Sequence, residues 1–382
     1  MVTATSSTDA LVTIDRVHAA RDLADDAGVD LLVLTPGSDL RYLSGYNAHA
    51  MERLTALAVP RSGEPFLVVP RLEAPMVDAG PAGGLGLEVL AWDETDDPFA
   101  LLAGAATARL GTAPVRVGVG ARTWAEHALG VQRALPGSAL ELASPVLDRL
   151  RMVKSAAEIE ELAAAGAAID RVHARMGEWL RVGRTEAEVG ADIAAAILAE
   201  GHVGVDFTIV GSGPNGASPH HELSGRTIGA GDLVVVDIGG ETATGYRSDC
   251  TRTYVVGGAA DAEVAEWYAV LRAAQEAATA AVRPGVTAQE IDAAARTVID
   301  DAGWGEHFIH RTGHGIGLDT HEAPYIVAGN DLPLVPGIAF SVEPGIYLAG
   351  RCGARIEDIV VCTEDGVRTL NDGPRELAEL AG

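Results

Sequence analysis

The alternation of hydrophobic and polar positions divides the chain into two parts that meet near residue 150. In the first part, Ile14–Ala27 has apolar residues at helical spacing, which predicts a helix. Short apolar runs bounded by turn residues predict strands at Leu31–Leu34, Phe66–Val69 and Val115–Val119. The glycine-rich stretch Gly80–Gly86 lacks the Lys-Ser/Thr ending of a phosphate-binding loop and is predicted to be a plain connection. Alternating helices and strands predict a small α/β domain over residues 1–150.

The second part, residues 151–382, contains long alanine-rich segments with clear helix starts. Three sequences have the spacing of a capping box: Ser155–Glu158, Thr185–Glu188 and Thr287–Glu290. Together with the apolar spacing, they predict helices near residues 155–181, 185–200, 261–281 and 287–302.

An internal repeat runs through this second part with an offset of roughly 105 residues. Three pairs of positions correspond: Gly183–Val189 with Gly285–Ile291, Gly231–Asp237 with Gly337–Glu343, and Asp249 with Glu357. A two-fold duplication would place Asp237 opposite Glu343 and Asp249 opposite Glu357. Four carboxylates are therefore predicted to converge on one pseudo-two-fold axis.

The first two of these carboxylates belong to a predicted hairpin. Asp237 ends the apolar run Leu233–Val236, and a glycine-rich turn leads from it to a second strand that carries Asp249. Two strands joined in this way can hold both carboxylates side by side.

The other two carboxylates also follow strand-like sequences. Glu343 comes directly after Ala339–Val342 and before a proline, which removes a donor from the strand ladder. Glu357 lies in the run Arg355–Val361, where alternation places it on the same face as Arg355.

Four acids in apolar sequence need compensation, because an unpaired buried charge is very unfavourable. The neighbouring basic residues, Arg247, Arg252 and Arg355, are too few to neutralise all four and still explain the clustering. His314, flanked by glycines, adds an imidazole to the set. One imidazole and four carboxylates suit Mn²⁺, Fe²⁺, Co²⁺ or Zn²⁺, and two divalent ions balance four negative charges. The sequence therefore predicts a two-metal site with a bridging hydroxide as nucleophile.

Four further histidines lie in the loops of this part: His220, His221, His310 and His321. A single histidine is usually a surface or core residue. Several together are predicted to donate hydrogen bonds to a substrate carbonyl that develops negative charge.

The composition of the chain disfavours some partners and some cellular locations. The 28 basic and 54 acidic side chains give a formal net charge of −26, which disfavours nucleic acids and anionic membranes as partners. No apolar run reaches the roughly 18 residues of a membrane span, and the first nine residues do not resemble a signal peptide. The three cysteines form no CxxC motif and are predicted to be small buried side chains in a cytoplasmic protein.

These motifs resemble those of the metal-dependent Xaa-Pro peptidases, prolidase and aminopeptidase P, of the pita-bread fold. The matching segments follow the order of that family: Ile209–His221, Gly231–Gly239, Tyr246–Thr253, Gly313–Leu318 with His321-Glu322, Val342–Tyr347 and Arg355–Asp358. The stretch Asp39–Tyr46 looks like the creatinase-type N-terminal domain. The resemblance implies an α/β protein with a creatinase-like domain over residues 1–150. Residues 151–382 would form a pita-bread metallopeptidase domain with internal pseudo-two-fold symmetry.

The resemblance also implies a role for each site residue. The implied metal ligands are Asp237, Asp249, His314, Glu343 and Glu357. Glu343 would also move a proton, His220 and His321 would bind the scissile carbonyl, and His310 and Arg355 would shape the proline side of the site. The implied cofactor is a pair of divalent ions, with Mn²⁺ preferred over Co²⁺, Fe²⁺ or Zn²⁺. The implied substrate is a small peptide with proline in second position, and a homodimer is expected.

Alternatives to an Xaa-Pro dipeptidase remain open at this point. The same ligands would serve an aminopeptidase P acting on longer peptides, or a metal-dependent amidohydrolase for a non-peptide substrate. A non-catalytic binding module would be expected to lose ligands. Tyr325 stands where some dipeptidases carry an arginine, so the sequence does not decide the length of the substrate. It also leaves open whether Arg355 binds a substrate carboxylate or braces Glu357.

Overall fold

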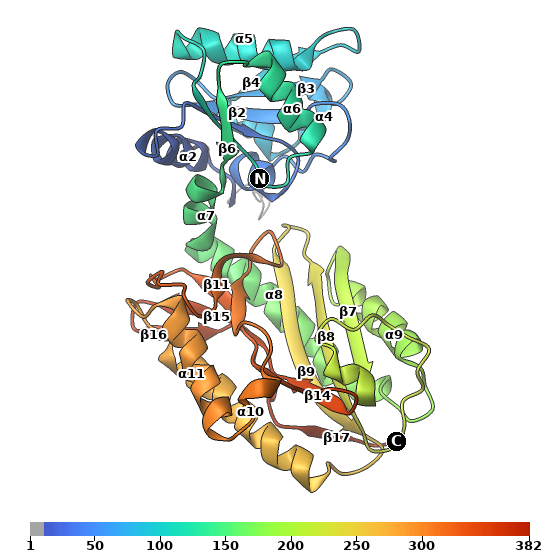
Figure 1. Cartoon of the computed structure of the whole chain (residues 1–382). Coiled ribbons are helices and arrows are strands. Elements are labelled where there is room, and N and C mark those ends of the chain that lie inside the picture. The colour runs from blue at the N-terminus through green and yellow to red at the C-terminus, as the bar shows by residue number, and fades with distance from the viewer. Residues whose placement is uncertain (1–10) are drawn as a thin grey trace, which may run out of the picture. The chain divides into compact units, whose positions relative to one another are not determined.

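The computed structural model describes residues 11–382 of the protein and divides after Arg151 into two compact units (Figure 1). The first nine residues, for which the sequence predicts no signal peptide, lie outside the described part. Between residues 11 and 382, no helix is both long and apolar enough to cross a membrane.

The N-terminal unit is built on a six-stranded mixed sheet in the order β4-β3-β2-β1-β5-β6. Its strands are β1 Leu31–Leu34, β2 Ala56–Pro60, β3 Phe66–Pro70, β4 Glu88–Trp92, β5 Arg116–Val119 and β6 Ala139–Leu142. Its helices are α2 Ile14–Asp26, α3 Ser38–Ser44, α4 Ala74–Ala79, α5 Pro98–Leu110, α6 Ala125–Ala134 and α7 Ser144–Met152, which ends at the boundary between the units. The central strand β1 is buried along its whole length, which explains its uninterrupted apolar sequence.

The stretch Gly80–Gly86 connects α4 to β4, as predicted, and is more ordered than a plain loop. It contains the 3₁₀ helix η1, Pro81–Leu85. Pro81 suits the first turn of a helix because its fixed backbone angle is already helical. Gly86 ends the turn with a φ of 70°, a left-handed conformation that glycine adopts readily.

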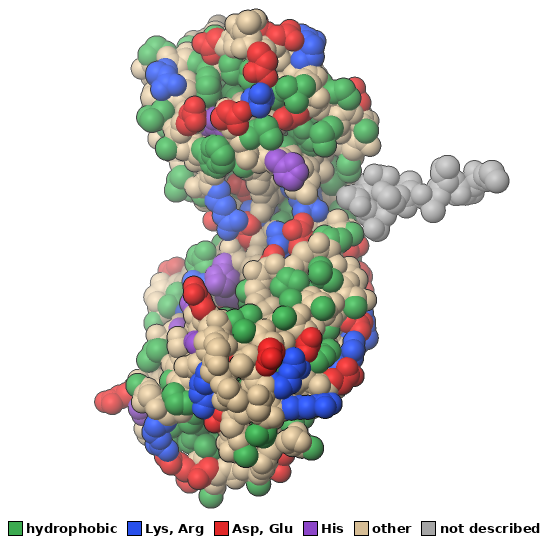
Figure 2. Space-filling view, turned by 90° about the vertical axis from the view of Figure 1, so that its right-hand side faces the viewer, with side chains coloured by type: hydrophobic (Ala, Val, Ile, Leu, Met, Phe, Trp, Pro, Cys, Tyr) green, Lys and Arg blue, Asp and Glu red, His purple; other side chains and the backbone are tan. Residues whose placement is uncertain are grey.

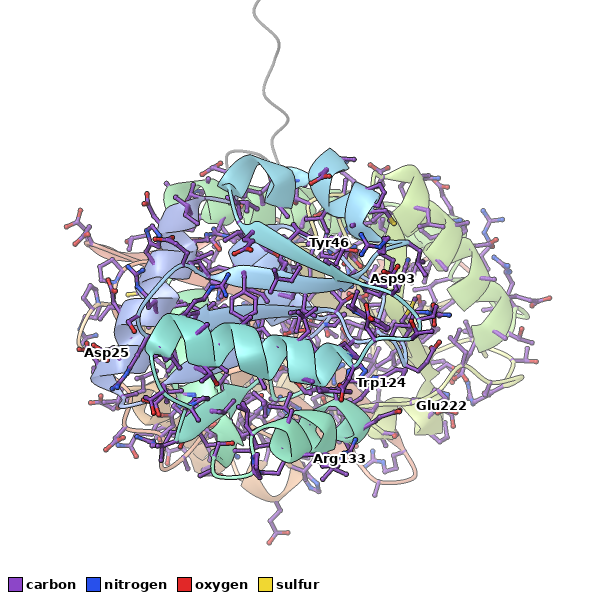
Figure 3. The ribbon with its side chains drawn as sticks, turned by 90° about the horizontal axis from the view of Figure 1, so that it is seen from above. Asp25, Tyr46, Asp93, Trp124, Arg133 and Glu222 are labelled. Atoms are coloured by element: carbon purple, nitrogen blue, oxygen red, sulfur yellow. The ribbon has the colours of Figure 1, made fainter. Side chains whose placement is uncertain are left out.

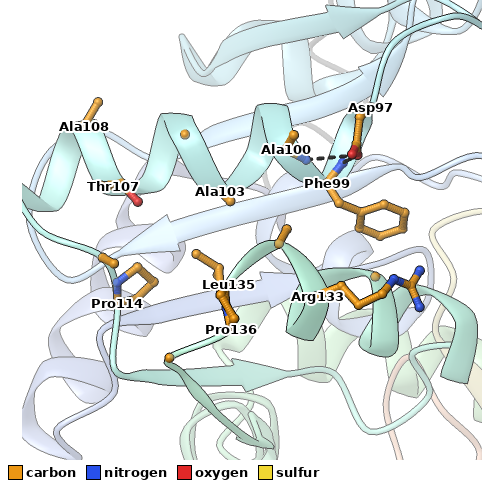
Figure 4. A pocket seen from close by; sticks show the side chains of 15 residues that line it. Asp97, Phe99, Ala100, Ala103, Thr107, Ala108, Pro114, Arg133, Leu135 and Pro136 are labelled. Atoms are coloured by element: carbon orange, nitrogen blue, oxygen red, sulfur yellow. Dashed lines mark hydrogen bonds between the residues drawn. The ribbon is translucent and has the colours of Figure 1, made fainter.

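Helices α5 and α6 lie next to one another on the sheet, and a cavity of about 770 Å³ lies between them (Figures 3 and 4). Small residues of α5, including Ala103 and Gly104, line one side, and Gly130 and Ala134 of α6 line the other. Asp97 caps α5 by accepting hydrogen bonds from the backbone N–H groups of the next turn. Acidic and basic side chains are interspersed on the face of this unit that Figure 2 shows.

The C-terminal unit contains two helix pairs and two larger sheets. The first half comprises α8 Ala156–Ala174, η2 Met176–Glu178, α9 Glu186–Ala199, β7 Gly204–Ser212, η3 Gly213–Ala217, β8 Asp232–Glu241 and β9 Arg247–Val256. The second half comprises α10 Ala262–Ala281, α11 Ala288–Asp301, η4 Gly305–His307, β10 Gly313–Gly315, β11 Glu322–Ile326, β12 Ala339–Val342, β13 Gly345–Leu348, β14 Cys352–Arg355, β15 Asp358–Thr363, β16 Gly366–Thr369 and β17 Ala378–Leu380. The sheet orders are β17-β9-β8-β7 and β11-β10-β12-β15-β16, and β13 pairs with β14.

The two halves repeat one local arrangement, as the sequence repeat predicts. Gly183 donates its backbone N–H to the carbonyl of Ile228 at 2.9 Å, and Gly285 donates to Leu334 at 2.8 Å. The two glycines have similar positive φ angles of 90° and 86°. The same turn therefore lies between the two helices of each pair, α8 and α9 in the first half and α10 and α11 in the second.

Most predicted helix boundaries in this unit hold to within about two residues. The capping boxes Ser155–Glu158 and Thr185–Glu188 form at the starts of α8 and α9. The helix predicted over residues 155–181 ends earlier, at Ala174, and only η2 follows it. Gly177 lies in this region, and its low helix propensity favours the early end.

Each half has its own hydrophobic core. Ile169 of α8 and Val236 of β8 belong to the first, and Trp267 of α10 and Phe340 of β12 belong to the second. Cys250 and Cys362 are buried and Cys352 is half-buried, and all three are free thiols.

Candidate metal centre

The β8–β9 hairpin holds the first two candidate carboxylates in the interior of the C-terminal unit. Asp237 lies opposite Thr251, and Gly239 lies opposite Asp249, so the two acids are diagonal neighbours on one face. Asp237 is in the middle of β8, and the prediction that it ends a strand is wrong. The strand continues through Gly239, which pairs with Phe207 of β7 and with Asp249 of β9. Glycine suits this position because a Cβ would lie 2.4 Å from the Ser248 carbonyl oxygen.

The second half of the repeat supplies the other two carboxylates. Glu343 follows the last residue of β12, as expected, and donates its backbone N–H to the Thr312 carbonyl. Glu357 lies between β14 and β15, so the predicted single strand Arg355–Val361 is interrupted. The break occurs because the backbone N–H of Glu357 donates to Thr251 of β9, which changes the partner of the chain.

His314 of β10 completes the cluster. Its Nδ1–H donates to the Gly315 carbonyl at 3.1 Å, which leaves Nε2 free to face the acids. Nε2 lies 3.2 Å from Oε1 of Glu343 and 3.7 Å from Oδ2 of Asp249. Three groups of candidate ligand atoms each lie within 4.8 Å of one another: His314 with Glu343 and Glu357, Asp237 with Asp249 and Glu357, and Asp249 with His314 and His321. The cluster thus brings together all five side chains that the sequence singles out as ligands.

The electrostatics of the cluster are unfavourable for four free carboxylates. Burial raises the pKa of Asp237, Asp249 and Glu357, and the charge of Glu343 raises all three further. Burial also opposes ionisation of Glu343, but the hydrogen bond and the charge of His314 prevail and lower its pKa. Acids that repel one another in this way are stabilised by divalent cations.

Two carboxylate oxygens of the cluster also indicate that it binds divalent cations. Oδ1 of Asp237 and Oε1 of Glu357 are buried without a hydrogen-bond partner among the described residues. Buried oxygens of this kind are rare in proteins and call for a bound group. Four carboxylates and one imidazole, with two unpartnered oxygens, therefore fit divalent metal ions.

Arg355 lies at the edge of the cluster with its side chain only 3% exposed. Its Nη2 donates to Oδ2 of Asp237 at 2.5 Å, and its Nε donates to the Thr251 hydroxyl at 3.0 Å. Its Nη1 donates to the hydroxyl of Tyr347 at 2.9 Å and to the Pro219 carbonyl at 3.3 Å. The guanidinium thus braces Asp237 directly, a role that the sequence does not predict.

The histidines occupy different positions around the cluster. The ring of His321 lies 3.9 Å from that of His314, between ring centroids. Burial and the neighbouring His314 lower the pKa of His321 to about 4, so this ring is neutral at pH 7. His310 accepts from the Tyr347 hydroxyl at 3.0 Å. His221 pairs with Glu186 instead, and the exposed His220 directly precedes it in the chain.

The sequence analysis does not identify several residues that contact the candidate ligands. Thr251 donates to Oε2 of Glu357 at 2.7 Å, Ser341 donates to Oε1 of Glu343 at 3.1 Å, and Tyr347 joins Arg355 to His310. Thr251 and Ser341 could have been found from the alternation of the strands, because each lies two residues from a candidate ligand. The large cavity between α5 and α6 belongs to the other unit and contains none of these residues.

Two family profiles match the chain. "Creatinase/Prolidase N-terminal domain" matches residues 16–153, and "Metallopeptidase family M24" matches residues 160–364. The "Probable dipeptidase PepE" of Mycobacterium tuberculosis is 56% identical over 369 residues, with 97% of each chain covered. The "Xaa-Pro dipeptidase" of Lactobacillus helveticus is 35% identical over 363 residues, with 92% of this chain and 95% of that protein covered.

The fold is also that of a solved structure. The dipeptidase PepE of Mycobacterium ulcerans superposes with a TM-score of 0.91 at 55% identity, covering 96% of this chain and 98% of that chain. The predicted fold class and enzyme class are confirmed by these matches. The chain therefore belongs to metallopeptidase family M24, with a creatinase-type N-terminal domain before a pita-bread catalytic domain, and is a peptidase.

Proposed function

We propose that the protein hydrolyses Xaa-Pro peptide bonds with two divalent metal ions and that dipeptides are its preferred substrates. The observation that carries this proposal is the buried cluster of four carboxylates and His314, in which two carboxylate oxygens lack a partner within residues 11–382. The named relatives include a dipeptidase and an Xaa-Pro dipeptidase, which supports the same bond type.

The five residues of the cluster would hold the metals. Asp237, Asp249 and Glu357 would hold one ion, and His314 and Glu343, together with Asp249 and Glu357, would hold the second. When bound, two divalent ions supply a Lewis acid for the scissile carbonyl and a water of lowered pKa. Mn²⁺ is the proposed ion because the donors are mostly carboxylates, with one imidazole.

The remaining chemistry falls to side chains of the chain itself. Oε1 of Glu343 faces Ser341 and His314, and Oε2 lies 4.0 Å from Nε of Arg355. Glu343 takes up a proton from the attacking water and passes it to the proline nitrogen. His321 is neutral at pH 7, and its ring donates a hydrogen bond to the carbonyl oxygen as negative charge develops there. His220 donates to the same oxygen. His310, held by Tyr347, borders the proline ring.

Arg311 supports the preference for dipeptides. Its guanidinium lies over the ring of Tyr325, 4.4 Å from the centroid, and Nη2 is 3.4 Å from Nδ1 of His321. It pairs with no carboxylate of residues 11–382, although the chain is strongly acidic. A half-buried cation of this kind, beside a residue that contacts the substrate, is suited to the free carboxylate of a dipeptide.

Two further elements complete the proposal. A homodimer is expected from the resemblance to the Xaa-Pro peptidases, and size-exclusion chromatography with light scattering tests it. A cytoplasmic location is proposed because all three cysteines are free thiols, as in a reducing compartment.

The test is hydrolysis by chelator-treated protein before and after addition of Mn²⁺. An Xaa-Pro dipeptide, an Xaa-Pro-Yaa tripeptide and a proline-free dipeptide are compared as substrates. Metal-dependent cleavage of the Xaa-Pro dipeptide in preference to the others is expected. Preference for the tripeptide would instead assign an aminopeptidase P, and cleavage of none of them would point to a non-peptide amide.

A further inference from the structure

A completely buried carboxylate lies outside the metal cluster, on Glu186 at the first turn of α9. It accepts hydrogen bonds from five donor groups. They are the backbone N–H of Ser212 at 2.8 Å, its hydroxyl at 2.7 Å, the Asn215 amide at 3.0 Å, the His221 ring at 2.8 Å and the Ser224 hydroxyl. Every donor belongs to one short segment, residues 212–224, which connects β7 to the strand that carries Asp237.

Hydrogen bonds and the start of helix α9 together stabilise the buried charge of Glu186. Burial alone would raise its pKa, but the hydrogen bonds from Ser224, Ser212 and His221 prevail and lower it, so Glu186 is ionised. The positive end of the α9 dipole stabilises the same charge. The ionised carboxylate therefore fixes the segment through hydrogen bonds from five donor groups.

The segment carries His220 between two fixed neighbours. On one side, the carbonyl of Pro219 accepts a hydrogen bond from Nη1 of Arg355 at 3.3 Å. On the other side, the His221 ring is held by Glu186. The ring of His220 is exposed and has no hydrogen-bond partner within residues 11–382.

The backbone next to His220 is also tied to the metal cluster. Arg355, which donates to the Pro219 carbonyl, also donates to Asp237 and to the hydroxyl of Tyr347, which bonds to His310. The segment therefore places His220 one residue from a contact with the guanidinium that braces the cluster.

We infer that Glu186 is a positioning residue for His220: it holds the segment 212–224 so that the His220 ring meets the scissile carbonyl. This inference rests on the proposed function, in which His220 donates to that carbonyl. A shift of about 1 Å in a group that contacts the reacting atoms can lower a rate about 100-fold. Loss of the anchor would therefore act on turnover while leaving the metal ligands in place.

The test uses the full-length, Mn²⁺-loaded protein and an Xaa-Pro dipeptide. In Glu186→Gln, the amide presents an NH₂ group to donors that need an acceptor, so the anchor is lost at nearly constant volume. We expect kcat to fall about 30- to 100-fold with KM within about 3-fold and metal content unchanged. Glu188→Gln is the matched control, because this exposed capping residue lies two positions further along the same helix turn and should keep the wild-type kcat.

A double-mutant cycle separates positioning from general weakening of the fold. If Glu186 acts through His220, Glu186→Gln has little further effect on kcat in the His220→Ala background. If the two losses multiply, or if Glu186→Gln alone keeps the wild-type kcat, the inference is overturned. Should Glu186→Gln fail to fold, Ser224→Ala removes a single donor and is expected to show the same coupling, in smaller degree.

A readout independent of activity distinguishes this inference from the proposed function. Hydrogen exchange of the backbone amides in residues 213–222 should be faster in Glu186→Gln, with exchange in β8 and β9 unchanged. Unchanged exchange in that segment would overturn the anchor even if the enzyme is an Xaa-Pro peptidase. A wild-type protein that cleaves no Xaa-Pro bond would overturn the catalytic role of His220. The exchange experiment would still show whether Glu186 holds the segment in place.

Discussion

Nη2 of Arg355 donates to Oδ2 of Asp237 at 2.5 Å, while Oδ1 of the same carboxylate is buried without a partner in the described part of the chain. One oxygen of Asp237 is thus held by a cation of the protein, and the other is left for a ligand. The same guanidinium contacts Tyr347, which in turn donates to His310. Arg355 therefore links a metal ligand to the predicted proline side of the site.

Replacing Arg355 tests this link. In Arg355→Met, Asp237 would remain buried without its cation, and breaking a buried pair of this kind costs about 3–5 kcal/mol. We expect denaturation of the metal-free variant to show a loss of unfolding free energy in this range. Excess Mn²⁺ should recover part of it, because the ion replaces the missing charge. Arg351→Met, which removes an exposed ion pair with Glu263, is the control and should change the free energy by less than about 1 kcal/mol. A similar small change in Arg355→Met would contradict the link.

His321 is expected to act on substrate without holding metal. His321→Ala should keep the wild-type metal content and lose about 100-fold in kcat/KM, since one donor to a developing oxyanion is removed. Elemental analysis and steady-state kinetics on the same preparation check both parts. The ring also lies in a group with Asp249 and His314, so loss of one metal ion in the variant would reassign it as a ligand. An unchanged kcat/KM would remove it from the catalytic residues.

Arg311 should distinguish substrates by their carboxylate. Arg311→Met is expected to lower kcat/KM for an Xaa-Pro dipeptide about 30-fold, the effect of losing one charged hydrogen bond. The same dipeptide with an amidated C-terminus should be nearly unaffected by the substitution. Arg283→Met, at an exposed arginine of the same unit, serves as the control. Equal losses for the free and the amidated substrate would show that Arg311 does not read the carboxylate.

His173 provides a pH-dependent contribution to stability away from the metal ligands. Its ring lies between the Tyr254 hydroxyl and the Cys250 carbonyl, and burial, with the charge of Arg252, lowers its pKa to about 3. Between about pH 6.5 and about pH 3, the unfolded chain therefore binds a proton that the folded protein does not. The contribution of His173 to the free energy of unfolding is fully present above about pH 6.5. It falls by about 1.4 kcal/mol per pH unit as the pH drops from about 6.5 to about 3.

The comparison with His173→Gln isolates this effect. The wild-type protein should be the more stable one at about pH 7, and its advantage should shrink by about 1.4 kcal/mol per unit from about pH 6 to about pH 4. Urea denaturation of both proteins in excess chelator measures the difference, since metal binding then plays no part. A difference that stays constant with pH would show that His173 does not titrate on unfolding.

Sequence patterns predict the fold and the clustering of the site for identifiable reasons. Capping boxes and apolar runs are local, and they locate β12 and the starts of α8 and α9 to within about two residues. The internal repeat carries long-range information, because equivalent positions of two copies lie on opposite sides of one axis. It therefore predicts that Asp237, Asp249, Glu343 and Glu357 converge, although the two pairs are far apart in the chain.

Predictions from the sequence fail where partners distant in the chain decide the local structure. β8 extends through its glycines because Gly239 pairs with Phe207 of β7 and with Asp249 of β9, and glycine alone would have suggested a turn. The break before β15 depends on Thr251, more than 100 residues away. The sequence around Glu186 does not show that this residue is buried and holds another segment. Glu188, two positions away, is also a glutamate of the first turn, yet it is an exposed capping residue. Contacts of this kind are set by tertiary packing, which periodicity does not encode.

The most direct test of the two-metal centre is the number of metal ions that each chain binds. After chelation and reloading with Mn²⁺, elemental analysis of the wild-type protein should find two ions per chain. Asp249→Ala, which removes a carboxylate proposed to serve both ions, should bind at most one and show no measurable hydrolysis of an Xaa-Pro dipeptide. A fully active Asp249→Ala protein, or a wild-type protein that is active with a single ion, would contradict the two-metal centre.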